Sequence, residues 1–387
     1  MSQINVRNLS NENEDGAPDI VGVSTFSATS YMVPPVGTTA QRPTNPQGGD
    51  LRFNTDSASL EYFKGDTIGW SQIEMTSPDL NGGGRGIRGG GNNASNTIEY
   101  YTIPTLGSSV DFGNLTSSGK AQAGAASRTR GIFAGGETPG LTADWEYITI
   151  SSTGDAIDAG DLTEARAMAT GFSNQTRAVF SGGYGGGSSY RNLTDYIEIA
   201  TTGSAIDFGD NTISTTNGAS CASSTRGILA GGQAPSPTNY YNNIAYFTTS
   251  TTGNALDFGD LTVARRTHTG GSNSIRGIFA GGQDTNPNTD NNCVNIIDYI
   301  TIATTGNAED FGDLTASSAN GKLNTMAPGF SATRGVWPGG RTGGGTAEDT
   351  MQYVEIATKG NAVDFGEVAD STGRYGPGGF SNSHGGL

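Results

Sequence analysis

The stretch RGIFAGG occurs at residues 130–136 and again, letter for letter, at residues 276–282. Looser copies begin at four other arginines: RGIRGGG at Arg85, RAVFSGG at Arg177, RGILAGG at Arg226 and RGVWPGG at Arg334. Successive arginines are 45, 47, 49, 50 and 58 residues apart. A period near fifty residues indicates an array of supersecondary units, so we expect six repeats.

Composition limits the function classes. The chain has 387 residues and a net charge of −16, so we expect neither nucleic acid nor an anionic membrane as partner. No apolar run approaches the roughly 20 residues that span a bilayer, and the polar, acidic start predicts no secretory signal. Cys221 and Cys293 occupy unlike positions in different repeats, which predicts two free thiols and no cysteine zinc site.

Each repeat reads as strands separated by turns. In the second repeat, GIFAGG is followed by a polar loop, then WEYITISSTG, DAIDAGDLTEAR and ATGFSNQTR. The pattern predicts four short strands per repeat and no helix. The apolar run GIFAGG is expected to be an inner strand, with its small residues at the crowded end near an axis.

This pattern of strand, double glycine, variable loop and strand resembles a kelch-type β-propeller over residues 79–387, although a DFG-like stretch stands where kelch repeats carry a tryptophan. The resemblance implies an all-β fold, with a six-bladed kelch-like propeller at residues 78–387. The C-terminal segment GPGGFSNSHGGL matches the strand that the first repeat lacks. We therefore expect it to complete the first blade and close the ring.

An aspartate recurs in the DFG-like stretch of every repeat, at Asp111, Asp158, Asp207, Asp257, Asp310 and Asp364. A kinase reading fails because the other kinase motifs are absent from the sequence. The aspartates could cap their own turns, or pair with the six repeat arginines between blades. A third interpretation is calcium binding together with the second aspartates Asp161, Asp210, Asp260 and Asp313.

Catalysis finds little support in the sequence. His268 and His384 are its two histidines and occupy the same kind of interblade segment, which argues against a histidine-ligated metal centre. Glycoside hydrolysis would need a pair of inward carboxylates that the pattern does not reveal. We expect no catalytic residue, no cofactor and no enzyme activity.

The loops after the double glycines vary most and are rich in Tyr, Asn, Ser, Gly and Asp, as adaptable binding loops are. Polar composition is also ordinary for loops, so a structural role remains open. If a site exists there, its predicted ligand-binding residues are Tyr184, Tyr190, Arg191, Tyr240, Tyr241, Asp284, Asp290 and Arg341.

Residues 34–77 predict a small β-hairpin module, with strands at LRFNT, LEYF and Trp70. The stretches GTTAQRP, GDLRFNT and LEYF, with that tryptophan, resemble a module of tailed-bacteriophage structural proteins. This resemblance implies a tail fibre or similar virion appendage, with residues 1–33 as an attachment arm that orders on docking.

Together, the two resemblances predict a virion protein whose residues 1–77 contact other virion proteins and whose propeller loops bind a host surface glycan or receptor. We expect synthesis in the host cytoplasm and a homo-oligomer; a trimer would give weak sugar sites an avidity gain of about 10² to 10⁴. A spacer or decoration protein without a ligand is the alternative. A glycan depolymerase and a cellular kelch adaptor are the remaining classes.

Overall fold

The computed structural model describes residues 34–56, 59–72, 84–91, 95–137, 139–187, 189–235, 239–285, 293–315, 323–324, 326–342, 347–369 and 376–387. The chain divides into two compact units, Met1–Ser77 and Pro78–Leu387, and each is described by itself. Strands dominate both, and the one helical element of the described residues is the 3-10 turn η1 (Thr39–Gln41). The predicted all-β class is confirmed. The expected attachment arm, residues 1–33, lies outside the described residues.

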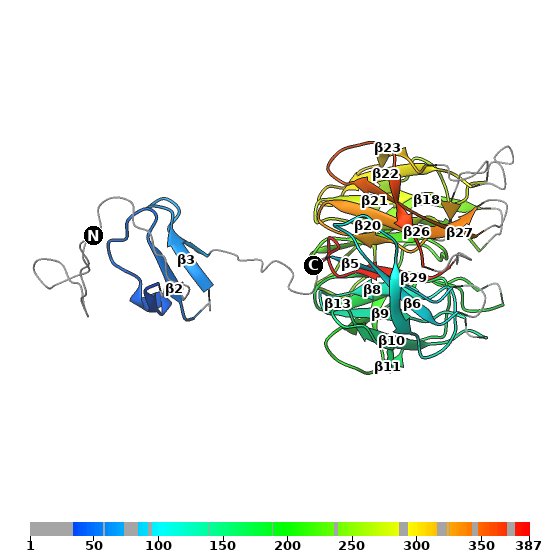
Figure 1. Ribbon diagram of the computed structural model, residues 1–387, viewed down its shortest axis with the longest axis horizontal. Helices are drawn as coiled ribbons and strands as arrows, with labels where there is room; N and C mark the ends of the chain where they lie inside the picture. The colour runs from blue at the N-terminus through cyan, green and yellow to red at the C-terminus, as the bar shows by residue number, and fades with distance from the viewer. Residues whose placement is uncertain are drawn as a thin grey trace, which may run out of the picture. The chain divides into compact units, whose positions relative to one another are not determined.

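The first unit holds a four-stranded sheet in the order β1-β2-β3-β4. Its two central strands, β2 and β3, are labelled in Figure 1. Its strands are β1 (Val36–Gly37), β2 (Leu51–Asn54), β3 (Ser59–Phe63) and β4 (Trp70–Gln72). β1 runs parallel to β2, and the other neighbours are antiparallel. The three predicted strands are present, and the segment before them adds a fourth.

A buried ion network stabilises this sheet. The antiparallel register places Arg52 directly opposite Glu61, and both side chains are buried. Arg42 donates two hydrogen bonds to the Glu61 carboxylate, at 3.2 and 2.7 Å, and the Asn54 amide donates a third at 3.1 Å. Both guanidinium groups lie about 6 Å from the ring of Trp70. The hydrogen bond from Arg42 is the main cause that holds the pKa of Glu61 below its usual value.

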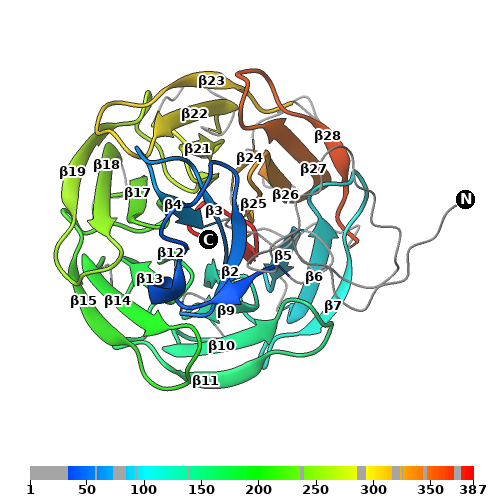
Figure 2. The ribbon, with the colours of Figure 1, turned by 90° about the vertical axis from the view of Figure 1, so that its left-hand side faces the viewer.

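The described part of the second unit contains six antiparallel sheets, one for each repeat (Figure 2). Sheet 1 consists of β29 (Gly378–Ser381), β5 (Arg85–Gly89), β6 (Thr97–Thr102) and β7 (Val110–Asn114). Sheet 2 consists of β8 (Ala123–Ala126), β9 (Arg130–Ala134), β10 (Asp144–Thr149) and β11 (Ile157–Asp161); sheet 3 of β12 (Thr170–Ser173), β13 (Arg177–Ser181), β14 (Leu193–Glu198) and β15 (Ile206–Asp210). Sheet 4 consists of β16 (Ala219–Ala222), β17 (Arg226–Gln233), β18 (Tyr240–Thr248) and β19 (Leu256–Asp260); sheet 5 of β20 (Thr269–Ser272), β21 (Arg276–Ala280), β22 (Ile296–Thr301) and β23 (Glu309–Asp313). Sheet 6 has five strands: β24 (Leu323–Asn324), β25 (Gly329–Phe330), β26 (Arg334–Thr342), β27 (Ala347–Glu355) and β28 (Val363–Glu367).

The sheets follow one another around a common centre in a propeller-like arrangement (Figure 2). The innermost strands β8, β12, β16, β20, β25 and β29 contact one another in that order, and β29 contacts β8 in turn. β29, at the C-terminus, pairs with β5 and so completes sheet 1. The innermost position is therefore held by AGAA- and GGFS-type segments, and the GIFAGG-type segments form the second strand of each sheet, an inner and buried strand as expected.

Small residues occupy the innermost strands because the backbones approach closely there. A Cβ atom added to Gly124 would lie 2.3 Å from the carbonyl oxygen of Gly379 in the adjacent sheet. At every second junction a serine makes two hydrogen bonds to one residue of the neighbouring sheet, and at the junction of sheets 3 and 4 the Ser220 hydroxyl donates a single bond to the Gly171 carbonyl at 2.5 Å. The Ser173 hydroxyl donates to the Ala126 carbonyl at 2.7 Å and accepts from the Ala126 N–H at 3.0 Å. Ser272 bonds Ala222 in the same way, and so does Ser381 with Phe330.

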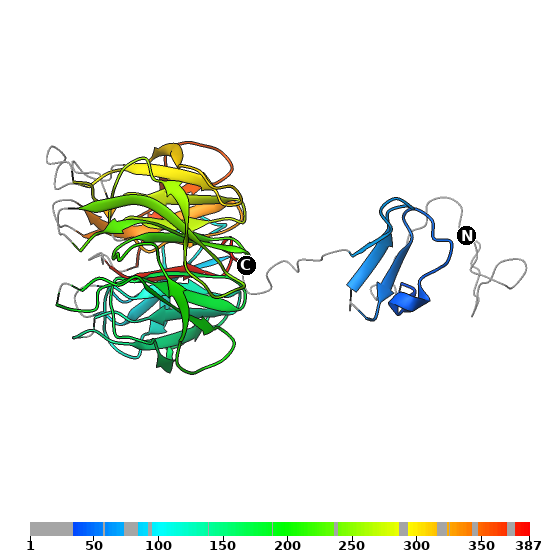
Figure 3. The ribbon, with the colours of Figure 1, turned by 180° about the vertical axis from the view of Figure 1, so that it is seen from behind.

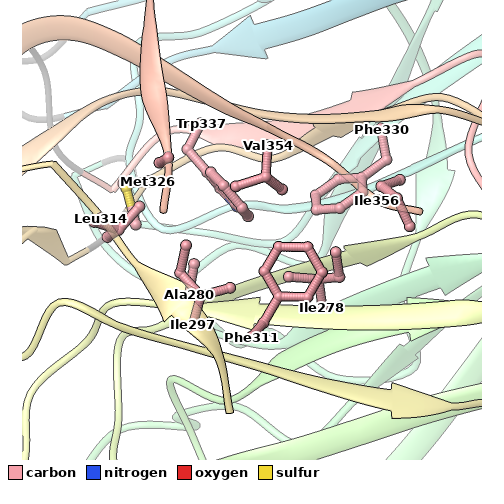
Figure 4. Close-up of a cluster of buried hydrophobic side chains, with 11 residues drawn as sticks. Ile278, Ala280, Ile297, Phe311, Leu314, Met326, Phe330, Trp337, Val354 and Ile356 are labelled. Carbon is pink, nitrogen blue, oxygen red and sulfur yellow. The ribbon is translucent and has the colours of Figure 1, made fainter. Parts of the chain in front are cut away.

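The hydrophobic core lies between sheets rather than within them. Six buried clusters occur, one at each junction between neighbouring sheets, including the junction of sheet 6 with sheet 1. Figure 4 shows the cluster in which Ile278 and Phe311 of sheet 5 meet Phe330, Trp337 and Val354 of sheet 6. Each sheet is therefore packed on both faces, which explains the apolar character of the second strands.

Hydrogen bonds also join each sheet to the next along the outer strands. The Gly154 N–H in the outer turn of sheet 2 donates to the Phe112 carbonyl of sheet 1 at 2.8 Å. Equivalent bonds start from Gly203, Gly253, Gly306 and Gly360. The series returns to its start, because the Gly107 N–H of sheet 1 donates to Phe365 of sheet 6 at 3.0 Å.

The six repeat arginines connect sheets through tyrosines and carbonyl groups. In each sheet the guanidinium carbon lies 4.3 to 5.1 Å from the ring centroid of a tyrosine on the third strand. Each guanidinium also donates to a backbone carbonyl of the next sheet, as Arg130 does to Ile199 at 3.0 Å. The other donors are Arg85, Arg177, Arg226, Arg276 and Arg334.

The aspartates of the DFG-like stretches play neither of the two structural roles proposed for them. All six lie exposed within the outer strands, and Asp111, for example, stands opposite Glu99 in the strand ladder. The proposed ion pairs with the repeat arginines are wrong, because those arginines bind tyrosines and carbonyls. At four of the turns, the residue after the turn glycine instead bonds the outer strand of the preceding sheet: Asp155 accepts from the Asn114 N–H at 2.8 Å, Asn254 accepts from the Asp210 N–H at 3.0 Å, and Asn307 and Asn361 do the same.

Candidate functional site

The double glycines end the second strands and define one end of every sheet. All twelve of these glycines have positive φ, and a Cβ at Gly135 would lie 2.4 Å from the Arg166 carbonyl. The double glycine is therefore a construction feature that turns the chain into the variable loop. We call this end of the second unit the loop face.

The opposite end, which we call the tail face, carries the start of β5 and the C-terminus. The Asn382 side chain accepts from the Arg85 N–H at 2.8 Å, so the C-terminal segment lies where β5 begins. The C-terminus lies near the centre of this face (Figure 2), and Figure 3 shows the same face edge-on. β5 therefore begins and the chain ends on the tail face, and the variable loops leave from the loop face.

A cavity on the axis is one candidate site, and its size argues against it. It has a volume of about 60 Å³ and is lined by innermost strands, including Ser173, Cys221 and Phe330. This is room for a few waters, whereas sites for small-molecule ligands span about 300 to 1,000 Å³. We therefore place no ligand there.

His384 of the C-terminal segment lines this cavity. Its Nε2 lies 3.2 Å from the Ser173 hydroxyl and 3.0 Å from the Ala126 carbonyl, and its Nδ1 accepts from the Gly386 N–H at 3.1 Å. Burial lowers the pKa of the imidazole to about 4. His384 is thus a neutral structural side chain that fastens the C-terminal segment to sheets 2 and 3.

On the loop face, Tyr184, Tyr190 and Arg191 form one cluster in the hairpin of sheet 3. Tyr184 and Tyr190 face each other across the hairpin, with ring centroids 6.1 Å apart in an edge-to-face arrangement. Arg191 pairs with Glu164, a contact that includes an Nε–Oε2 hydrogen bond of 2.7 Å and lowers the pKa of that carboxyl group. The charge of Arg191 is thus balanced within the protein.

Tyr240 and Tyr241 belong to the hairpin of sheet 4. Tyr240 stands opposite Gln233 in the ladder, and Tyr241 stands opposite Gly232. The guanidinium of Arg266, in the connection from sheet 4 to sheet 5, lies 5.0 Å from the Tyr240 ring. Sequence reasoning missed Arg266, because it varies between repeats and lies outside the loops after the double glycines.

The other predicted residues are less suited to a ligand contact or cannot be placed. Asp284 is buried, with 9% of its surface exposed. Arg341 is half-buried at the end of β26, opposite Ala347. Asp290 lies outside the described residues. The eight predicted ligand-binding residues therefore do not form one site. The structure instead has two clusters of tyrosine and arginine side chains, one on each of two neighbouring sheets.

Buried ion pairs hold the connection that carries Arg266. Arg265 pairs with Asp298 of sheet 5 at 3.0 Å, with both side chains fully buried, and also donates to the Phe279 carbonyl at 3.2 Å. The Thr262 hydroxyl donates to the same carboxylate at 2.7 Å. Arg166 and Asp195 form the equivalent pair between sheets 2 and 3. These pairs have a signal in the sequence, because the stretches EAR and VAR each precede an acidic residue in the third strand of the next repeat. The repeat pattern alone did not show that this arginine and this acidic residue are in contact.

The described residues contain no group of three or more His, Cys, Asp or Glu side chains placed to hold a metal ion. Within the same ranges, no helix has the length and hydropathy to cross a membrane. No known protein family matches the chain, and none of the curated proteins compared with it matches either.

Proposed function

We propose that the second unit is a six-bladed kelch-like β-propeller and that the chain is a virion appendage protein of a tailed bacteriophage. In this proposal the first unit contacts other virion proteins, and the loop face binds a host surface glycan or receptor. The N-terminal stretches that resemble a phage module support the virion assignment. Several of them meet in one network, since Arg42, Arg52 and Glu61 come from three of the stretches.

One observation carries the binding role: the two faces of the second unit differ in what they present. The tail face carries the start of β5 and the C-terminus, while the loop face carries Tyr184, Tyr190 and Tyr240 beside cationic side chains. Half-buried tyrosines supply contact area at low entropic cost, which suits a shallow polar site. This difference suits an adhesion protein, because the face with the tyrosines and cations is not the face that holds the C-terminus.

The test is binding of the full chain, as isolated and as an artificial multimer, to a glycan array and to host cells. We expect binding that is lost in the double variant Tyr240→Ala, Tyr241→Ala and retained in the matched variant Tyr147→Ala, whose tyrosine stacks on Arg130 at the tail-face end of sheet 2. If the folded wild-type multimer binds neither target, the chain is a spacer or decoration protein instead.

A further inference from the structure

We propose that Arg266, held by Gln233 and Gln283, is the receptor for the carboxylate of an acidic sugar on the loop face. This inference deepens the proposed function and rests on it. It names the class of glycan: one whose residues each carry a single carboxylate, such as a uronic acid.

The first step is how Arg266 is held. Its Nε donates to Gln283 Oε1 at 3.2 Å, its Nη1 donates to Gln233 Oε1, and its guanidinium covers the ring of Tyr240. Both oxygens belong to neutral amides, so they fix the orientation of the guanidinium without balancing its charge. Within the described ranges, no carboxylate makes an ion pair with Arg266, and the remaining N–H groups, including both on Nη2, have no acceptor.

The repeats supply an internal comparison. Arg266 and Gln283 exchange two backbone hydrogen bonds in line with the β20–β21 ladder of sheet 5, and Lys120 and Glu137 do the same in line with the β8–β9 ladder of sheet 2. There the cation is balanced, because Lys120 Nζ lies 3.3 Å from Glu137 Oε2. Sheet 5 has the amide of Gln283 where sheet 2 has a carboxylate. The same construction therefore carries a balanced cation in one repeat and an unbalanced, oriented one in the other.

The chemistry of this group selects the ligand. A planar guanidinium fork matches a carboxylate in a bidentate geometry, and a single positive charge balances a single negative charge. A densely charged polyanion would be repelled by a chain of net charge −16, whereas one carboxylate read locally is tolerated. The Gln283 amide nitrogen, which donates one N–H to Cys293 Sγ at 3.9 Å, has a second N–H suited to donate to a hydroxyl group of the same sugar, whereas Gln233 is buried and serves to hold Arg266.

The experiment is saturation-transfer NMR on the full chain with three probes: methyl β-D-glucuronide, the neutral methyl β-D-glucoside and the 6-sulfate of that glucoside. We expect the glucuronide to bind at least about tenfold more tightly than either comparison sugar. Arg266→Gln and Gln283→Glu should each weaken glucuronide binding about ten- to one-hundredfold. Gln283→Glu is the sharper variant, because it reproduces the balanced arrangement of sheet 2 without changing side-chain volume. Lys120→Gln is the control and should bind as the wild type does.

Equal binding of the glucuronide and the neutral glucoside, or undiminished binding by Gln283→Glu, would overturn the inference. Equal binding of the sulfate would make Arg266 a general anion site and overturn the carboxylate assignment. The host-cell assay separates this from the proposed function. If wild type and Arg266→Gln bind cells equally, the protein is an adhesin but Arg266 is not its receptor for a carboxylate. If the protein binds the glucuronide but not cells, Arg266 binds a carboxylate but the protein is not an adhesin.

Discussion

Ser381 and Phe330 exchange two hydrogen bonds across the junction between the last sheet and the first. The serine hydroxyl donates to the Phe330 carbonyl at 2.6 Å and accepts from the Phe330 N–H at 3.1 Å. Both groups are buried, so neither bond is replaced by water when the serine is removed. This pair fastens the C-terminal strand, which completes sheet 1, to sheet 6.

Replacement of Ser381 by alanine should therefore lower the free energy of unfolding by about 1 to 3 kcal/mol, because it leaves a buried N–H and a buried carbonyl without this partner. Urea unfolding followed by tryptophan fluorescence measures the change. Ser383→Ala is the control, since its hydroxyl only adds a 3.1 Å bond to the same carbonyl, and it should cost less. A fully stable Ser381→Ala protein would mean that the junction does not depend on this pair.

Acid should destabilise the second unit through His384. The folded pKa of about 4 lies below the ordinary value of 6.5, so the unfolded state binds more protons between these two pH values. Stability should fall as the pH drops from about 6.5 to about 4, by up to about 3 kcal/mol from this side chain. The measurement is the difference in the free energy of unfolding between wild type and His384→Gln at pH 7 and at pH 4.5. A difference that does not shrink as the pH falls would contradict the assignment.

In the first unit, Glu61→Ala should lower stability by about 1 to 3 kcal/mol. The change removes the hydrogen-bond acceptor of Arg42 and the ion-pair partner of Arg52, but Arg42 stays one-third exposed, which reduces the cost below the 3 to 5 kcal/mol of a fully buried pair. Since the pKa of Glu61 is lowered, its contribution is present above the ordinary value of 4.5 and is lost as the pH falls through the folded pKa. Amide hydrogen exchange within residues 34–72 reports this unit separately. Unchanged exchange in Glu61→Ala would contradict the role of the network.

Asp298→Ala should cost about 3 to 5 kcal/mol, because it leaves Arg265 buried without its counter-ion. The size of the loss is checked by urea unfolding, with Asp257→Ala as the control, since Asp257 is exposed on the outer strand of sheet 4. If the two variants are equally stable, the buried pair contributes nothing of its own. The same variant should weaken glucuronide binding, because Arg266 follows Arg265 directly.

Much of the fold could be predicted because the repeats are local. A fifty-residue period, strands between Thr-Gly turns and a C-terminal segment like GFSN follow from letters close together in the chain. The identity of the innermost strand could not be predicted, because it depends on the close approach of Gly124 to Gly379, which lies at the other end of the sequence. The partners of the repeat arginines were also missed, because every residue has a backbone carbonyl and the sequence does not show which one accepts the hydrogen bond.

The candidate site was also predicted only in part, because the sequence shows composition but not contacts between distant residues. Tyrosines in the loops after the double glycines are visible as composition, and Tyr184, Tyr190 and Tyr240 do lie there. Arg266 becomes visible only when Gln283 and Glu137 are compared as equivalent positions, which requires the backbone bridges that they make with Arg266 and Lys120 within their own sheets.

The serine contacts at every second junction have a consequence for the number of sheets. Ser173, Ser272 and Ser381 all lie on odd-numbered sheets and bond even-numbered neighbours, so two kinds of sheet alternate around the axis. Alternation closes without a mismatch when the total is even. A ring with one sheet more or fewer would set two sheets of one kind side by side. Repeats are therefore expected to be added or removed two at a time, which is about one hundred residues.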